Sequence, residues 1–385
     1  LEPDFASGLV FAESGYTAFT TAPVELGKII TDLLFDLRRA IDDLSGEPQS
    51  KLRDFLFDLL WFSTALNDLF DEKYVTALVP DSYKFASFEN RYGPEDIRRL
   101  PVEIHLQCMD VSASLTRVFG KRHIPVFFSA TLTPIQWFES MYYSADQPRA
   151  LKANLPSPFE PDHLLLLEFS GLDLSWKFRS KNAPYLAGLI EAVIETDPGN
   201  IMVFFPSFAY MNEVRPHLAS LLEKYPTYTQ LWQERDMNES QRREFLAAFE
   251  SEKTNVIACA VLGGIFGESI DLVGSRLKGV IVIGTGLPQP TPERQLERVW
   301  WQRFYHNGYE FAFVYPGFIK VLQAAGRVIR GEEDRGFVIL VDERFTTQDY
   351  RELYPKHWYP KRVANINEMV DALGNFIGRE RYNDS

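Results

Sequence analysis

Apolar residues between Val24 and Asp71 recur every three or four positions. This spacing places them on one side of a helix, and the Gly-Glu-Pro sequence at 46–48 interrupts the pattern. We therefore predict a pair of amphipathic helices here. The stretches at 73–79 and 102–111 have the short apolar patterns that are typical of strands.

Farther along the chain, short apolar runs alternate with helical patterns. The runs indicate strands at 124–132, 163–169, 200–207, 228–232, 254–261, 277–284 and 336–342. The helical patterns lie at 134–144, 184–196, 210–225, 240–251, 293–308 and 319–330. Near-continuous apolar runs are typical of strands that are buried on both faces of a parallel sheet. The alternation therefore predicts an α/β domain, in which ligands bind at the carboxyl ends of the strands.

Composition and charge exclude several classes of function. The 385 residues give room for two or three domains, and the formal net charge is -13. Such an acidic chain does not wrap nucleic acid by bulk charge, so any nucleic-acid site must be a local groove. The chain has two cysteines, too few for a disulfide framework or a four-cysteine iron-sulfur cluster.

Targeting and metal signals are absent from the sequence. It has no apolar run of eighteen residues and no basic leader before an apolar core, so we expect no membrane contact and a cytoplasmic location. The six histidines are scattered, without a His-x-x-x-His or Cys-x-x-Cys pattern, and we predict no metal site built by this chain.

Small residues follow several of the predicted strands. They occur at 129–134, 206–208 and 263–271, and Gln289 and Pro290 follow the strand at 277–284. Small side chains let backbone N–H groups approach a phosphate or a sugar closely, although such turns often bind nothing. In combination they predict a ligand-binding edge.

Arg327 and Arg330 are a further candidate. On the helix predicted at 319–330 their spacing places them on one side, with Gln323 one turn earlier. On spacing alone, an ordinary solvated stripe is favoured.

Four motifs occur in an order that resembles a known family. They are "FFSATLTP", "NIMVFFPSFAYMNEV", "GGIFGESIDLVGSRLKGVIVIGTGLPQP" and "QAAGRVIRGEEDRGFVILVDERF". This series resembles the later helicase motifs of superfamily 2 DNA helicases of the XPD and DinG type. The resemblance is strong from about residue 100 to residue 346. It implies RecA-like domains, two of which clamp ATP between them in that family.

The resemblance assigns roles to the arginines and to their neighbours. Arg327 and Arg330 match the arginines that the second motor domain directs at the phosphates of ATP bound by the first domain. Charge builds up on the phosphoryl oxygens in the transition state, and a guanidinium stabilises it. The implied nucleotide-binding residues are Gln323, Gly326, Glu268 and Asp271. The family usually has Gly where this chain has Ser269.

Other residues match coupling and DNA-binding positions of the family. Ser129 and Thr131 match the motif that relays nucleotide state to DNA, although they would also be suited to cap the helix that begins near Pro134. The implied DNA contacts are Pro206, Ser207, Phe208 and Thr285. Phe205, Phe208 and Trp232 are candidates for stacking on bases.

Two motifs of the family do not occur in this sequence. There is no Gly-x-x-x-x-Gly-Lys-Ser/Thr phosphate loop and no Asp-Glu-Ala-His string. We therefore expect the C-terminal part of an ATP-dependent DNA helicase, which needs a separate N-terminal motor domain to hold ATP with Mg²⁺ and does not hydrolyse ATP alone. The implied domains are a helical arch-like insertion (1–100), a remnant of the first motor domain (101–150) and the second RecA-like domain (151–385).

Two alternatives remain. In the first alternative, the chain is a non-catalytic module that derives from a helicase domain and binds nucleic acid or a protein partner. The second alternative is a Rossmann-like enzyme. Such an enzyme needs a Gly-x-Gly-x-x-Gly sequence after its first strand, and none occurs in this chain.

Overall fold

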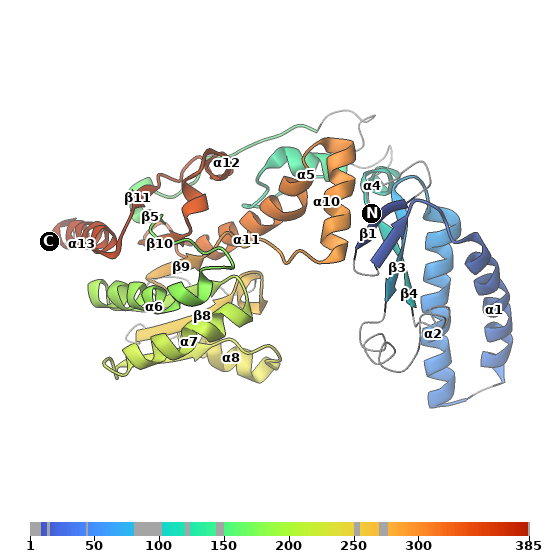
Figure 1. Ribbon diagram of the computed structural model, residues 1–385, viewed down its shortest axis with the longest axis horizontal. Helices are drawn as coiled ribbons and strands as arrows, with labels where there is room; N and C mark the ends of the chain where they lie inside the picture. Colours follow the sequence, from blue (N-terminus) through green and yellow to red (C-terminus); the bar gives the residue numbers. More distant parts are fainter. Residues whose placement is uncertain are drawn as a thin grey trace. The chain divides into compact units, whose positions relative to one another are not determined.

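The computed structural model divides the chain into two compact units (Figure 1). Unit 1 contains Leu1–Val126, Glu139–Ala150 and Gln289–Ala312, and unit 2 contains Phe127–Phe138, Leu151–Pro288 and Phe313–Ser385. The structure describes residues 9–13, 16–43, 45–80, 102–119, 124–143, 150–249, 255–268 and 276–383. The domain limits expected from the sequence stay a prediction.

Unit 1 is built on an antiparallel sheet of four strands in the order β1-β2-β3-β4. The strands are β1 (Leu9–Glu13), β2 (Tyr16–Phe19), β3 (Tyr74–Pro80) and β4 (Val102–Cys108). The strands predicted at 73–79 and 102–111 are therefore confirmed. In the described part of the region 1–100, helices occupy more residues than the strands β1, β2 and β3 do. Its interpretation as an arch-like insertion stays a prediction.

The two predicted N-terminal helices are confirmed. They are α1 (Val24–Asp42) and α2 (Glu47–Thr64), and the π-helical turn η1 (Ala65–Leu69) continues α2. Pro48 lies in the first turn of α2, where its missing N–H costs no hydrogen bond. Unit 1 also contains α4 (Ser112–Phe119) and α10 (Pro292–Tyr305), while α5 (Ile135–Tyr142) crosses the limit between the units.

Unit 2 contains a parallel sheet of seven strands in the order β11-β5-β10-β9-β6-β8-β7. The strands are β5 (Leu164–Phe169), β6 (Ile201–Phe205), β7 (Tyr228–Trp232), β8 (Asn255–Val261), β9 (Gly279–Ile283), β10 (Gly336–Val341) and β11 (Lys361–Val363). The predicted parallel α/β domain is confirmed. All six residues of β10 are buried, as its position inside the sheet requires.

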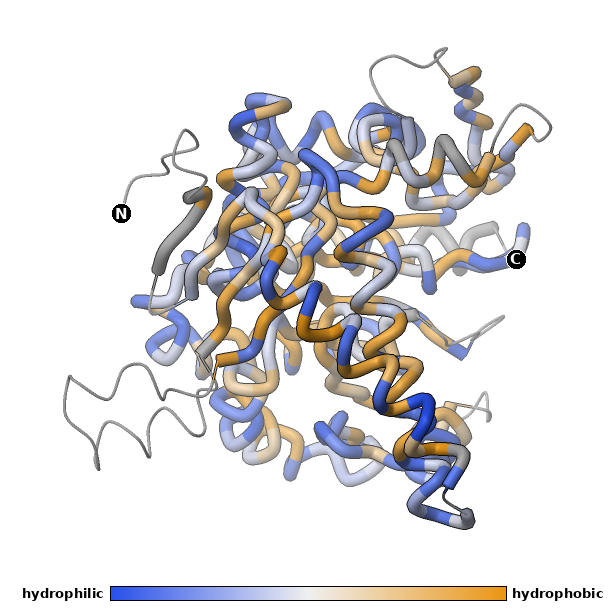
Figure 2. Tube along the Cα trace, turned by 90° about the vertical axis from the view of Figure 1, so that its right-hand side faces the viewer, coloured by the Kyte–Doolittle hydropathy of each residue, from blue (hydrophilic) through white to orange (hydrophobic). Residues whose placement is uncertain are grey.

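Helices cover both faces of this sheet, and the side chains of one strand alternate between two hydrophobic cores. Ile201, Val203 and Phe205 of β6 belong to the core that contains α6, α7 and α13, whereas Met202 and Phe204 belong to the core that contains α8 and α11. This alternation follows from the two-residue repeat of a strand. Figure 2 shows hydrophobic and hydrophilic segments alternating along the chain trace.

The helices and turns of unit 2 link the strands in chain order. They are η3 (Pro161–His163), α6 (Arg179–Thr196), α7 (Phe208–Leu222), α8 (Glu239–Ala247), α9 (Ile265–Glu268), α11 (Tyr315–Ala325), η5 (Glu343–Thr346), α12 (Gln348–Arg351) and α13 (Ile366–Asn383). The π-helical turn η4 (Glu310–Val314) crosses from unit 1 into unit 2. None of the helices in the described ranges combines the length and the apolar character that a membrane crossing requires.

Two predicted elements differ from the structure. The strand predicted at 124–132 is wrong, because these residues have no regular structure and the described strands do not pair with them. Without a hydrogen-bonded neighbour an apolar run does not form a strand, and Ile124 and Phe128 are exposed. The helix predicted at 319–330 ends earlier, at Ala325, where Gly326 caps it.

Candidate nucleotide and nucleic-acid site

The carboxyl ends of the central strands meet at one edge of the parallel sheet. The backbone N–H of Leu262, after β8, donates to the carbonyl of Phe205 in β6 at 2.9 Å. The N–H of Gly284, after β9, donates to the carbonyl of Val341 in β10 at 2.9 Å. The segments after these strands, which carry most of the predicted site residues, therefore begin side by side. We call the segments that directly follow β5, β6, β8, β9 and β10 the strand-end edge.

Ser207 caps helix α7 directly after β6. Its backbone is extended, and its hydroxyl accepts a hydrogen bond from the N–H of Tyr210 at 3.2 Å. The hydroxyl thus has a structural role, while the other N–H groups of the first turn keep the partial positive charge of a helix N-terminus. Pro206 and Phe208 flank it and are half-buried. These three predicted DNA contacts lie together at the strand-end edge.

Phe208 also borders a shallow hollow. The guanidinium of Arg235 lies over the Phe208 ring, 5.1 Å from its centre. The hollow has a volume of about 290 Å³ and is lined by residues of α7, of the segment after β7 and of α8, including Glu234 and Asp236. Two carboxylates make this hollow a poor site for a phosphate.

The turn after β9 is tightly packed. Gly284 and Gly286 have positive φ angles of 76° and 71°, and a Cβ at Gly286 would lie 2.6 Å from the carbonyl oxygen of Gly317 in α11. Thr285 between them is 1% exposed, and its hydroxyl has no hydrogen-bond partner among the described residues. The predicted contact of Thr285 with DNA would therefore require this turn to open.

Arg327 lies inside unit 2 and not on its surface. Its side chain is 4% exposed, and Nη2 donates a hydrogen bond to the carbonyl of Gly267 in α9. The interpretation as a solvated helical stripe is wrong for Arg327, because α11 ends at Ala325 and the chain turns inward. The bond places Arg327 beside Glu268, while Gln323 is half-buried on α11 and Asp271 and Ser269 lie outside the described residues.

Arg330 is exposed, and its backbone is fixed by Asp334. Oδ2 of Asp334 accepts hydrogen bonds from the N–H groups of Arg330 and Gly331, at 2.8 and 2.7 Å. One carboxylate thus holds the turn that presents Arg330. Asp334 lies within the fourth motif quoted from the sequence, but no role was assigned to it there.

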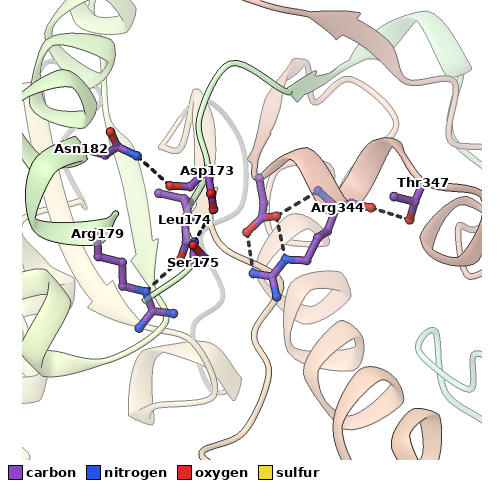
Figure 3. A network of polar contacts seen from close by, with 8 residues as sticks. Asp173, Leu174, Ser175, Arg179, Asn182, Arg344 and Thr347 are labelled. Carbon is purple, nitrogen blue, oxygen red and sulfur yellow. Dashed lines mark hydrogen bonds and ion pairs between the residues drawn. The ribbon is translucent and has the colours of Figure 1, made fainter. Parts of the chain in front are cut away.

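An ion pair between a buried carboxylate and a half-buried arginine follows β10 (Figure 3). Arg344 donates to Asp342 through Nε and Nη2, at 2.8 and 2.7 Å, and Asp342 is 1% exposed. The pKa of the nearby Asp173 is lowered, mainly by hydrogen bonds from the backbone and side chain of Ser175 and further by the charge of Arg344. The loop after β5 and the loop after β10 therefore share one electrostatic environment.

Ser129 and Thr131 form a local turn. Their hydroxyls lie 3.1 Å apart, and the N–H of Thr131 donates to Oγ of Ser129 at 3.1 Å. In the described part of the chain, no hydrogen bond joins this pair to the strand-end edge. Their predicted coupling role stays a prediction.

The described residues offer no cluster for a metal. Within the ranges given above, no three His, Cys, Asp or Glu side chains are grouped so that they could hold an ion. Burial in β8 raises the pKa of the Cys259 thiol, so this cysteine is not a reactive one. The expectation that Mg²⁺ arrives with ATP stays a prediction.

Among the residues proposed to stack on bases, the structure separates buried from accessible rings. Phe205 is fully buried in the core, so it cannot stack on a base. Trp232 is half-buried under the guanidinium of Arg215. The most exposed ring at the strand-end edge is Trp176, which sequence reasoning did not single out; its neighbours "SWKFRSK" were the available signal.

The fold and the strand-end edge define an α/β domain with a parallel sheet and helices on both faces. Residues 190–361 match the family model described as "Helicase C-terminal domain". These residues therefore carry this domain, and the chain is similar to helicases of the XPD type.

Curated helicases are similar to most of this chain. The chain is 26% identical to a regulator of telomere elongation helicase 1 homolog of Caenorhabditis elegans over 75% of its length. It is 23% identical to the general transcription and DNA repair factor IIH helicase subunit XPD/RAD3 of Saccharomyces cerevisiae over 85% of its length. The chain spans 31% of the first relative and 42% of the second.

Solved structures agree on the fold. An apo XPD structure covers 86% of this chain with a TM-score of 0.51 and 18% identity, and the chain covers 72% of it. Another XPD helicase structure covers 89% of this chain with a TM-score of 0.51 and 15% identity, and the chain covers 62% of it.

Proposed function

We propose that this chain is the second motor region of an ATP-dependent DNA helicase. In this proposal its strand-end edge binds single-stranded DNA, and its exposed arginine, Arg330, reaches the phosphates of an ATP that a first motor domain holds with Mg²⁺. The observation that carries the proposal is the pair of arginines after α11: Arg327 is bonded to the loop that contains Glu268, and Arg330 is presented by the Asp334 turn.

The two arginines have different roles in this proposal. Arg330 is exposed, so a phosphate brought by another domain can reach its guanidinium. Arg327 is buried against Gly267, so it acts by joining the end of α11 to the α9 loop. Closure on ATP would then move both segments together. A guanidinium supplied to the transferred phosphoryl group stabilises the transition state.

DNA contact in this proposal is independent of base sequence. Backbone N–H groups at the start of α7 and neighbouring cations suit the phosphates of a single strand. A relative's name alone does not give this chain its substrate. The support here is the position of Pro206, Ser207 and Phe208 at the strand-end edge.

Binding of a single strand tests the DNA part of this proposal. We expect the 385-residue chain to bind a fluorescein-labelled dT20 oligonucleotide in an anisotropy titration. About three phosphate contacts would raise Kd roughly twentyfold between 50 and 200 mM NaCl. Absence of any binding at 50 mM would contradict DNA contact by this chain. An unlabelled blunt duplex is the competitor control, and it should compete less well than unlabelled dT20.

A further inference from the structure

The loop between β5 and α6, Gly171–Phe178, is held firmly in place. We call it the β5 loop. Leu172 and Leu174 are buried in the core. Nδ2 of Asn182 donates to the carbonyl of Asp173 at 2.7 Å, and Nε of Arg179 donates to the carbonyl of Leu174 at 3.1 Å (Figure 3). Helix α6 thus fixes the backbone of this loop from one side.

On this fixed backbone the loop exposes a large aromatic ring. Trp176 is 81% exposed, and Phe178 and Tyr185 are 43% and 41% exposed. Phe178 precedes α6 directly and Tyr185 lies about two helical turns further, so both belong to one side of the helix start. An exposed indole on an ordered loop is costly in water, which makes it a candidate for contact with a ligand.

The charges around Trp176 are mainly positive. Lys177, Arg179 and Lys181 follow it within five positions, in a chain whose formal net charge is -13. The nearest carboxylates are already engaged. Asp173 accepts the N–H of Ser175 at 2.8 Å, and Glu213 accepts the hydroxyl of Ser180 at 2.9 Å. The β5 loop is therefore a local basic and aromatic surface.

The β5 loop also adjoins the proposed DNA site. The guanidinium of Arg179 lies over the ring of Tyr210, 5.5 Å from its centre. Tyr210 is in the first turn of α7, where its N–H donates to Ser207. The first residue of α6, directly after the β5 loop, therefore contacts the start of α7 at the strand-end edge.

A second exposed indole provides a contrast. Trp61 in α2 is 70% exposed, so exposure alone does not distinguish it from Trp176. The charged residues within seven positions of Trp61 are all acidic: Asp54, Asp58 and Asp68. Such surroundings repel a phosphate backbone. The combination of an exposed ring with cations is what sets Trp176 apart.

We propose that the β5 loop is a base-stacking contact for single-stranded DNA, with Trp176 stacked on a base and with Lys177 and Lys181 beside the flanking phosphates. The inference rests on the proposed function and extends the DNA site from α7 to the end of β5. Aromatic platforms beside cations bind single strands with little sequence preference, because every base offers a flat face. The basic surroundings favour a nucleic acid over an apolar protein partner.

The test is an anisotropy titration of the full chain with labelled dT20. Trp176→Ala should raise Kd about five- to hundredfold, the range that loss of one stacked base gives. Trp176→Phe should keep most of the affinity, because it keeps a ring. Trp61→Ala is the matched control and should leave Kd unchanged. Far-UV circular dichroism of each variant confirms that it is folded.

Tryptophan emission gives a second readout. Binding of unlabelled dT20 should quench the emission of the wild-type chain, and most of this quenching should be lost in Trp176→Phe although the oligonucleotide still binds. If Trp176→Ala binds dT20 as tightly as the wild type does, the stacking proposal is overturned while DNA binding by the chain stands. If the wild-type chain does not bind dT20 at all, both proposals fail.

Discussion

Two arginines three positions apart have different environments in this protein. Their spacing alone predicts one shared helical face, but α11 ends at Ala325 and the arginines follow in a turn. Gly326 ends the helix, as glycine often does, and this signal is present in the sequence. The burial of Arg327 could not be predicted, because it depends on the Gly267 carbonyl, which lies 60 positions away in the chain.

Replacement of Arg327 should destabilise the chain. Arg327→Met fills similar space but removes the hydrogen bond to the buried Gly267 carbonyl. A lost bond that leaves a buried acceptor unsatisfied costs about 1–3 kcal/mol. Urea unfolding followed by circular dichroism measures this change in the free energy of unfolding.

Arg243→Ala is the matched control for that measurement. Arg243 is exposed on α8, so the free energy of unfolding should change by less than about 0.5 kcal/mol. If Arg327→Met and the wild type had the same free energy of unfolding, the buried contact would not stabilise the fold, and the prediction would be wrong.

At the scale of elements, apolar runs predicted the strands of the parallel sheet well, since strands buried on both faces leave a continuous apolar signal. The short hairpin of β1 and β2 was missed, although "LVFAESGYTAF" has a Ser-Gly pair at its centre. The run at 124–132 was assigned to a strand wrongly, because sequence shows apolar character but not whether a neighbouring strand exists.

The contact between α12 and β5 could not be predicted from the sequence either. Glu168 is fully buried in β5 and accepts two hydrogen bonds from Arg351 in α12, at 3.2 Å from Nε and 2.5 Å from Nη2. Burial and the Glu168 carboxylate raise the pKa of Tyr354 well above its usual range. Because 183 positions separate the two partners, no local pattern indicates the pair.

Breaking this pair should loosen the end of unit 2. Arg351→Ala leaves the Glu168 carboxylate buried without its partner. Removal of one partner from a fully buried pair costs about 3–5 kcal/mol. We expect this variant to lose about 2–4 kcal/mol in the free energy of unfolding. The double variant Glu168→Leu with Arg351→Met should recover most of the loss, because it removes both charges. Urea midpoints report both changes.

Gln348→Ala is a control on the same helix. Gln348 makes only an exposed bond with Glu352, so its removal should change stability little. A midpoint for Arg351→Ala equal to that of Gln348→Ala would contradict a stabilising role of the pair.

At the scale of the whole molecule, the order of four strand-end motifs predicted the helicase C-terminal domain that the family comparison then found at 190–361. Several residues of the candidate site gather at the edge where parallel strands end, as the topology requires. The sequence could not show that Thr285 is enclosed, or that Trp176 is exposed on the β5 loop. These outcomes depend on packing between loops that lie far apart in the chain.

The central claim is that Arg330 acts on the phosphates of ATP. The most direct test is single-strand-stimulated ATP turnover by the complete protein that carries this chain together with a phosphate-loop motor domain. The account predicts that Arg330→Ala lowers kcat about a thousandfold or more, while Kd for dT20 and the urea midpoint stay near the wild-type values, and that Arg243→Ala changes none of the three. Turnover by Arg330→Ala at the wild-type rate would contradict the account.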